Sequence, residues 1–419
     1  MSFDWTDETL GDLISRDEAH LQTGPFGTAL KASEYSEDGV PLISVREIRE
    51  GFLQIVKDTP RVCEATTQRL PKFLLQQGDI VFGRKGAVDR NAVISFEQEG
   101  WFLGSDGIRL RLSNKYDSLF FSYLMRSSAT RAWLLQNSEG TTMLSLNQKT
   151  LARVPVRYPT VEIQKRISTQ LRTLDDKITL NIKINQTLEQ MAQAIFKSWF
   201  VDFDPVKAKM NGEQPEGMDE ATASFFPDKL VESELGLIPY GWEAVKVGDI
   251  VERLKPKKRY TKKQVEPYGK TPVYEQGASI LLGFHNDEAG FDATPEEPIF
   301  IFGDHTCITY LSCSEFDISS NVIPLKGSIR PTIWTYYAIQ GKQEFQEYRR
   351  HWSEFIVKNV VLPPSELTQK FAEIVTTNYL MMESLKRQSK QLEQVRDTLL
   401  PKLLSGEIEL DVEKVNAND

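Results

Sequence analysis

Two long stretches of the chain repeat apolar residues at alternating intervals of four and three. In residues 363–404 this spacing selects Phe371, Val375, Asn378, Met382, Leu385, Ser389, Leu392, Arg396 and Leu399. In residues 156–204 it selects Ile167, Leu171, Leu174, Ile178, Asn181, Asn185, Leu188, Ala192 and Ile195. An apolar seam of this period is typical of a coiled coil, and an Asn within it fixes the register of the helices. About 36 helical residues span ~54 Å. The pattern predicts two long helices that pair antiparallel, although a single apolar stripe can equally pack on a globular core.

The two stretches are copies of one another. Residues 188–190 and 392–394 both read Leu-Glu-Gln, and the alignment at this offset of 204 extends without gaps back to Pro159 and Pro363. Near the start of each half, "WTDETLGDLI" (from residue 5) matches "WEAVKVGDIV" (from residue 242) at an offset of 237. Between them, "DIVFG" (79–83) resembles "IFIFG" (299–303), and "GSDGIRL" (104–110) resembles "SSNVIPL" (319–325). Four anchors in one order indicate a duplicated chain. The duplicated helix places Leu188 and Leu392 on the seam, and Glu189 and Glu393 are expected to face solvent or a partner.

Each half begins with a segment rich in short β-type runs, punctuated by Gly, Pro, Asn and Asp, as strands and turns are. The runs are "VPLISVREI" (40–48), "GDIVFG" (78–83), "AVISF" (92–96), "PVYEQG" (272–277), "EPIFIFG" (297–303) and "CITYL" (307–311). One short helix is predicted after each set, over 118–135 and 331–348.

The resulting fold is α+β, with two β-rich domains and two long helices related by an internal pseudo-two-fold repeat. The first β-rich domain is expected over 1–155 and its long helix over 156–204. A linker rich in Gly, Pro and acidic residues follows over 205–238. The second β-rich domain is expected over 239–362, its long helix over 363–404 and a tail, with one further strand, over 405–419.

Composition favours a cytoplasmic protein of two or three domains. The chain has 419 residues, of which 40% are hydrophobic and 26% charged. No run reaches the roughly 18 apolar residues of a membrane helix. The first residues lack the pattern of a signal peptide, and the three cysteines have no paired spacing, which argues against a disulfide framework.

The sequence lacks the usual motifs of catalysis. It has no nucleophile elbow, no Cys/His cluster with metal-ligand spacing and no phosphate-binding Gly-Lys-Ser/Thr loop. Asp202 and Asp204 lie close to Lys207 and superficially resemble part of a nuclease site, but a solvated linker explains them better. Neither an adenosylmethionine-binding glycine motif nor an Asn-Pro-Pro-aromatic methyltransferase motif is present. We therefore expect a chain without catalytic residues, metal or cofactor of its own.

Basic residues are concentrated in a few places, although the net charge is −9. "RLKPKKRYTKK" (253–263) holds seven cations and no acid, among them Lys255, Lys257, Lys258, Arg259, Lys262 and Lys263. In the first half, "GRKGAVDRN" (83–91) carries Arg84, Lys85 and Arg90, and His305 aligns with Lys85. Such stretches are either solvated loops or contacts to phosphates and base edges. Two diverged domains at a fixed spacing are suited to reading two different short DNA sequences.

The order of these segments resembles that of the specificity subunits of type I restriction–modification systems. The resemblance covers essentially the whole chain. It is strongest at "EGTTMLSLNQKTLARVPVRYPTVEIQKRI" (139–167) and "LDDKITLNIKINQTLEQMAQAIFKSWFVDFDPVKAKM" (174–210), and recurs at "PPSELTQKF" and "LLPKLLSGEIEL".

The resemblance implies more than the residue patterns do. In this family each β-rich domain is a target-recognition domain, and together they read a bipartite, asymmetric sequence in double-stranded DNA. The helices form a coiled coil that sets the unread gap and docks two modification subunits. Those partners use adenosylmethionine to methylate adenine, and restriction subunits use ATP and Mg²⁺ to cleave unmodified DNA, a defence against phage. The second helix has Arg396 where the first has Ala192, so the two docking sites need not be equivalent.

Two hypotheses therefore follow from the sequence. The first is a DNA-specificity subunit, and the second is a scaffold of a defence complex whose domains bind another ligand. A third, a methyltransferase, conflicts with the missing motifs. The base-contacting residues do not follow from the resemblance because the recognition domains are the variable part of the family.

Overall fold

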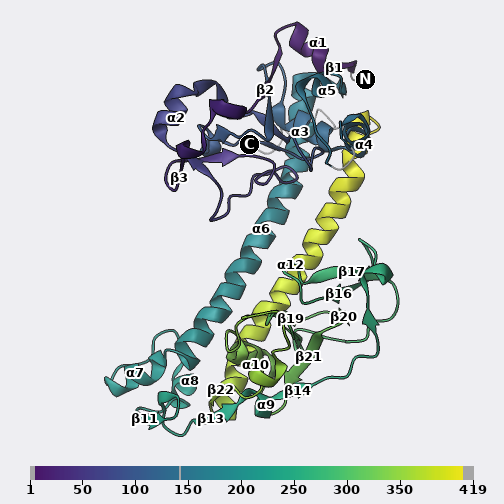
Figure 1. The fold of residues 1–419 in the computed structure, drawn as a ribbon. Coiled ribbons are helices and arrows are strands. Elements are labelled where there is room, and N and C mark those ends of the chain that lie inside the picture. Colours follow the sequence, from purple (N-terminus) through teal and green to yellow (C-terminus); the bar gives the residue numbers. More distant parts are fainter. Residues whose placement is uncertain (1–4, 141–142, 409–419) are drawn as a thin grey trace, which may run out of the picture. The chain divides into compact units, whose positions relative to one another are not determined.

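The computed structural model describes residues 5–140 and 143–408, and it divides into two compact units. Unit 1 comprises residues 1–178 and 390–419, and unit 2 comprises residues 179–389. Helices α6 (Val161–Phe200) and α12 (Ser365–Ser405) contribute one segment each to both units. Figure 1 shows each unit as sheets beside its own segments of α6 and α12. Within the described ranges, no helix is both long and apolar enough to cross a membrane.

Unit 1 contains two four-stranded sheets. The first has the order β2-β9-β6-β7, with all neighbours antiparallel (Ala19–Thr23, Gly107–Leu112, Ile80–Gly83 and Asn91–Val93). The second has the order β3-β5-β4-β8 (Tyr35–Ser36, Arg61–Val62, Val40–Ile43 and Phe102–Leu103). Side chains of β6 alternate between two cores: Ile80 and Phe82 pack with α3 (Ser118–Arg126), whereas Val81 packs towards the second sheet. The remaining helices are α1 (Leu10–Ser15), α2 (Glu64–Arg69), α4 (Ser128–Asn137) and α5 (Gln148–Ala152).

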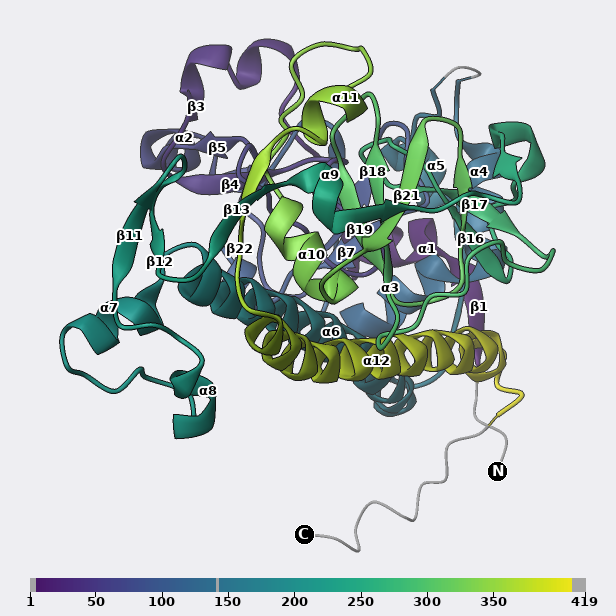
Figure 2. The ribbon, with the colours of Figure 1, turned by 90° about the horizontal axis from the view of Figure 1, so that it is seen from below.

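Unit 2 repeats this plan. Its first sheet has the order β14-β21-β18-β19, again antiparallel throughout (Val251–Arg253, Val322–Gly327, Ile299–Gly303 and Thr309–Ser312). Its second sheet has the order β15-β20-β16-β17 (Arg259–Tyr260, Asp317–Ser319, Thr271–Tyr274 and Leu281–His285). Phe300 and Phe302 share a core with α10 (Thr332–Ile339), whereas Ile301 faces the second sheet. Figure 2 shows α10 between the first sheet and α12. Two short helices complete the unit's β-rich part, α9 (Val247–Ile250) and α11 (Trp352–Phe355).

The strand register confirms the duplication expected from the sequence. Phe82 pairs with Ile108 in unit 1, and the aligned residues Phe302 and Ile323 pair in unit 2. The backbone N–H of Leu10 donates to the carbonyl of Val154, and the N–H of Val247 donates to the carbonyl of Lys358, which lies 204 positions after Val154. The predicted α+β fold with two related β-rich parts is therefore correct.

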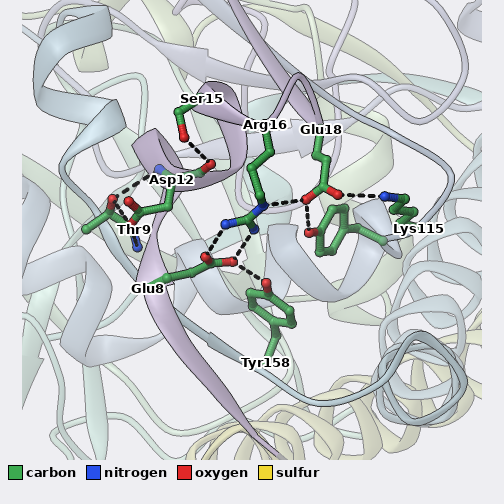
Figure 3. Close-up of polar contacts among 9 residues, drawn as sticks. Glu8, Thr9, Asp12, Ser15, Arg16, Glu18, Lys115 and Tyr158 are labelled. Carbon is green, nitrogen blue, oxygen red and sulfur yellow. Dashed lines mark hydrogen bonds and ion pairs between the residues drawn. The ribbon is translucent and has the colours of Figure 1, made fainter.

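A two-stranded antiparallel ladder precedes each long helix. In unit 1 it joins β1 (Thr6–Thr9) to β10 (Pro155–Tyr158), and in unit 2 it joins β13 (Glu243–Lys246) to β22 (Asn359–Leu362). The ladder of unit 1 is tied to its sheet by ionic groups (Figure 3). The guanidinium of Arg16 contacts both carboxylate oxygens of Glu8 at 2.7 and 2.8 Å and one oxygen of Glu18 at 3.0 Å. Lys115 pairs with Glu18 at 2.7 Å, and Tyr158 donates to Glu8.

The segments of α6 and α12 lie antiparallel in each unit. In unit 2 the side-chain amide of Asn181 donates to Gln388 and Ser389 at 2.9 and 3.2 Å, and that of Asn378 donates to the carbonyl of Leu188 at 3.4 Å. In unit 1 Ile163, Ile167 and Leu171 share a core with Leu399, Leu403 and Leu404. All residues of the predicted seam are buried or half-buried. The first residues of each seam, including Ile167 and Phe371, also pack into the core of a β-rich part. At its start, each long helix therefore packs against a globular core, which was the alternative to a coiled coil.

Several local expectations from the sequence are wrong. The run "VPLISVREI" (40–48) is a strand only over Val40–Ile43. The helix predicted over 118–135 is broken at Ser127, whose hydroxyl caps α4 by accepting from the N–H of Thr130. The helix predicted over 331–348 ends at Ile339. The run "AVISF" extends as a strand only to Val93.

The segment expected as a linker carries regular structure. Residues 205–238 contain most of α7 (Asp204–Met210), all of α8 (Glu220–Ser224) and β11 (Leu230–Ser233), and most of β12 (Gly236–Pro239). Val206 and Phe226 are buried in the core of unit 2. The sequence of this segment has no helical or strand periodicity, because its helices and strands are short. They are stabilised by the burial of a few residues. The strand expected in the tail falls on residues 409–419, outside the described residues.

Candidate nucleic-acid interface

In unit 1 the basic turn after β6 meets two other loops at one edge of the first sheet. The guanidinium of Arg84 donates from Nε to the carbonyl of Ser105 at 2.9 Å and contacts Asp106 at 3.1 Å. Its Cζ lies 4.9 Å from the ring centre of Phe26, which belongs to the "GPFG" loop after β2. A side chain on Gly83 would place its Cβ 2.5 Å from the carbonyl oxygen of Ala87, so this tight turn requires glycine. The loops after β2 and β6 and the turn before β9 therefore form one surface.

The three predicted cations of this turn differ in accessibility. Arg84 is 19% exposed and held by Asp106, whereas Lys85 is 45% exposed and lies 3.4 Å from the same carboxylate. Arg90 is half-buried. Lys85 is therefore the most accessible of the three to a phosphate, and Arg84 fixes the shape of the surface.

In unit 2 the equivalent edge carries different side chains. Asp304 aligns with Arg84, and its carboxylate accepts from the backbone N–H groups of His351 and Trp352 at 3.2 and 3.0 Å. The ring of His305 lies edge-on to Tyr348, with ring centres 4.7 Å apart. Arg253, the last residue of β14, lies over Trp352 at 5.7 Å. The stretch that begins at Arg253 and the turn with His305 thus both contact the segment 348–352.

The cations of residues 253–263 fall into two groups. Lys255, Lys257, Lys262 and Lys263 are exposed. Lys258 pairs with Asp287 at 3.3 Å and lies over the ring of Tyr260. Arg259 donates to the carbonyls of Ser319 and Val322 at 2.7 and 2.9 Å, and burial lowers the pKa of its guanidinium. Arg259 therefore holds β15 against β20, and the four lysines are the side chains available to a ligand.

Sequence reasoning missed a second basic site in unit 1. His20, Gln22, Lys72, Arg109 and Arg111 line a cleft of about 370 Å³ on the sheet face formed by β2 and β9. The signal was present in "GIRLRL" (107–112), where arginines alternate with apolar residues. Such alternation is also the ordinary pattern of a strand with one solvated face.

Comparisons with known proteins agree with this architecture. The family model described as "Type I restriction modification DNA specificity domain" matches residues 4–190. The chain is 22% identical to the type I restriction enzyme MjaIX specificity subunit of Methanocaldococcus jannaschii, over 91% of this chain and 89% of that protein. It is 26% identical to the type I restriction enzyme HindI specificity subunit of Haemophilus influenzae, over 69% of this chain and 77% of that protein.

A solved structure has the same fold. The S subunit of the type I restriction–modification system from M. genitalium matches with a TM-score of 0.56 and 16% identity, over 96% of each chain. These findings agree with the motifs quoted above. They are the family match over residues 4–190, the two relatives that match most of the chain, and the shared fold. In sequence and in fold, the chain is therefore similar to the specificity subunits of type I restriction–modification systems.

Proposed function

We propose that this chain is the non-catalytic subunit that gives a type I restriction–modification complex its DNA sequence specificity. Each unit reads one half of a bipartite, asymmetric target in double-stranded DNA. The observation that carries the proposal is the equivalence of two loop edges on one repeated framework. Arg84 and Lys85 occupy the positions that Asp304 and His305 occupy in unit 2. Because base edges are distinguished by the donors and acceptors presented to them, different side chains at equivalent positions favour different half-sequences.

The paired helices supply the other part of the proposal. As a coiled coil they set the gap between the two half-sequences and dock two modification subunits. The contacts of the buried Asn181 with Gln388 and Ser389 support a fixed register, because displacing the helices would leave the buried amide of Asn181 without these partners. The modification subunits would supply adenosylmethionine-dependent adenine methylation, and restriction subunits would supply ATP- and Mg²⁺-dependent cleavage.

The proposal is tested by removing charge from the exposed loop of unit 2. The double variant Lys255→Gln/Lys257→Gln is compared with Lys246→Gln/Lys358→Gln, whose lysines are also exposed but precede α9 and β22. Binding of the assembled complex to duplex DNA is measured by fluorescence anisotropy at several salt concentrations. The slope of log K against log salt is negative, and each lost phosphate contact reduces its magnitude by about 0.9.

We expect weaker binding and a smaller salt slope for the loop variant alone. Equal affinity and slope for the loop variant and the wild type would exclude residues 255 and 257 as DNA contacts. Failure of the wild-type complex to retain any duplex in a sequence-dependent way would contradict the proposed function and favour a scaffold that binds another ligand.

A further inference from the structure

The basic cleft of unit 1 is formed by neighbouring residues of two strands and one short turn. His20 and Gln22 of β2 pair with Arg111 and Arg109 of β9 across the sheet. Lys72 lies in the short 3-10 turn Pro71–Phe73, and Pro71 and Leu74 line the cleft beside it. The alternate residues of β9, Ile108 and Leu110, lie on the opposite face of the sheet, in the core with α3. The cleft therefore brings His20, Lys72, Arg109 and Arg111 together, with Arg111 paired to Asp79.

Arg109 lies at the bottom of the cleft without a carboxylate partner. It is 5% exposed. Its NH1 donates to the carbonyls of Lys72 and Leu74 at 3.2 and 3.4 Å, and its NH2 lies 3.3 Å from Nδ1 of His20. Nε is buried and, in the part of the chain that the structure describes, has no hydrogen-bond partner. No described Asp or Glu forms an ion pair with Arg109 within 4.0 Å.

The neighbouring acid is already engaged by another arginine. Both carboxylate oxygens of Asp79 accept from Arg111 at 2.7 Å. Burial lowers the pKa of Arg109, against the attraction of Asp79. A buried guanidinium with an unsatisfied N–H costs free energy unless an anion pairs with it. An oxyanion in the cleft would place a negative charge beside the buried guanidinium of Arg109, which has no carboxylate partner among the described residues, and Arg pairs with phosphate oxygens in charge-assisted hydrogen bonds.

We propose that the cleft of His20, Lys72, Arg109 and Arg111 binds a phosphate group. Its position favours a phosphate of the DNA backbone as the source, a choice that rests on the proposed function. Gln22 pairs with Arg109, Thr23 pairs with Ile108, and the N–H of Gly24 then donates to the carbonyl of Gly107. At ~3.4 Å per residue the cleft begins about 7 Å from the loop that carries Phe26. A DNA strand at that loop edge would place a neighbouring phosphate over the cleft.

Unit 2 has no equivalent of this site. Glu252 pairs with Lys326 where His20 pairs with Arg111, and Leu254 and Pro324 stand at the positions of Gln22 and Arg109. An acid and two apolar residues replace three of the polar groups. The phosphate contact thus belongs to one half of the target only, and it adds affinity there without reading a base.

The test uses the full chain and two phosphate sources. Lys72→Gln and His20→Gln change exposed side chains, and Arg109→Lys keeps the charge but removes Nε. Lys326→Gln is the matched control in unit 2. In the first arm, duplex binding is measured over a range of chloride concentrations. In the second arm, the melting temperature is measured with inorganic phosphate against chloride at equal ionic strength, because a ligand that binds the folded state raises it.

A cleft that binds backbone phosphate predicts a salt slope smaller by about 1 for Lys72→Gln and unchanged for Lys326→Gln. A cleft that binds free phosphate predicts stabilisation of the wild type by inorganic phosphate, lost in Lys72→Gln and Arg109→Lys, with no change in the DNA slope. If neither the slope nor the phosphate-induced stabilisation differs between wild type and the cleft variants, the inference is overturned. A wild type that binds phosphate but no duplex would contradict the proposed function and leave the cleft assignment intact.

Discussion

Unit 1 and unit 2 attach equivalent helices to α6 and α12 with different polar groups. In unit 1 the hydroxyl of Tyr123 on α3 donates to Asp175 at 2.6 Å, and Arg396 contacts the same carboxylate at 2.8 Å. In unit 2 the position equivalent to Asp175 is Tyr379. There the hydroxyls of Tyr379 and of Tyr337 on α10 both reach Glu189, at 2.7 and 3.0 Å.

The difference shows what the repeated framework requires at this place. In both units a carboxylate on α6 accepts from a tyrosine of the equivalent helices α3 and α10 and from a residue of α12. The carboxylate is at residue 175 in unit 1 and at residue 189 in unit 2. These two positions are not equivalent in the repeat. Burial raises the pKa of Tyr337 and Tyr379, so both phenols remain donors at neutral pH. The fold therefore demands a satisfied polar junction and tolerates different residues in it.

The largest effect is expected from emptying the core beside this junction. Phe371 is fully buried, with ring centres of Phe196, Phe200 and Tyr337 within 5.8 Å, whereas the equivalent Ile167 packs in the core of unit 1. Phe371→Ala should cost about 3–5 kcal/mol of unfolding free energy and Ile167→Ala about 2–5 kcal/mol. The two cores have none of the described residues in common. Hydrogen exchange should therefore show each loss first in the unit that carries the substitution; equal loss of protection in both units would show that they unfold together.

A smaller effect is expected from breaking the junctions themselves. Asp175→Ala removes the acceptor of Tyr123 and the ion-pair partner of Arg396, and should cost about 1–3 kcal/mol. Tyr379→Phe leaves Glu189 bonded to Tyr337, and should cost about 0.5–1.5 kcal/mol. Asp176→Ala is the control, because Asp176 is 67% exposed and, among the described residues, forms an ion pair only with exposed Arg172. Urea unfolding measures all three, and equal losses for Asp175→Ala and Asp176→Ala would mean that the unit 1 junction contributes little.

The smallest effect concerns the ladder of unit 1 in acid. Lys115, Tyr116 and Arg16 lower the pKa of Glu18 to about 2, and Arg16 also lowers the pKa of Glu8. The stabilisation that the Glu8 and Glu18 carboxylates contribute is complete above the pKa of an unfolded-state Glu, about 4.3. It is lost as the pH falls towards 2 and these carboxylates are protonated. At the positions of Glu8 and Tyr158, unit 2 has Val245 and Leu362. Digestion with pepsin between pH 4.5 and 2 should therefore cut the β1–β10 ladder before the β13–β22 ladder.

A matched variant isolates this cause. Glu8→Gln/Glu18→Gln removes both carboxylates, so its ladder should be cut at a rate that changes less over the same pH range. Cleavage of the unit 2 ladder first in the wild type would contradict the assignment.

Patterns of spacing predicted most of the fold, because duplication leaves a signal that needs no knowledge of contacts. The aligned "DIVFG" and "IFIFG" runs proved to be β6 and β18 with matching partners. The seam residues are all removed from solvent to some degree, because a 3.5-residue period places them on one face. The end of the helix at Ile339 and the short elements of 205–238 depend on tertiary packing, which spacing does not record.

The polar sites were less predictable, because their partners are distant in the chain. Glu189 was expected to face solvent or a partner protein; in the structure two tyrosines, 148 and 190 positions away, donate to it. Arg259 stood out as one cation among seven, yet its partners are backbone carbonyls near residue 320. In the sequence, Arg109 has the pattern of a solvent-facing arginine on a strand. In the structure, its guanidinium donates to the backbone carbonyl of Lys72 in a turn that is distant in the chain.

The most direct test of the account is the map of methylated adenines in DNA modified by the complex in which this chain is proposed to act. Two units with equivalent frameworks and different loop edges predict that every modified adenine lies in a bipartite sequence with two unlike halves and a constant gap. Exchange of residues 84–85 for the aligned pair 304–305 should then alter one half and leave the gap unchanged. Modification of a continuous palindrome would contradict the account.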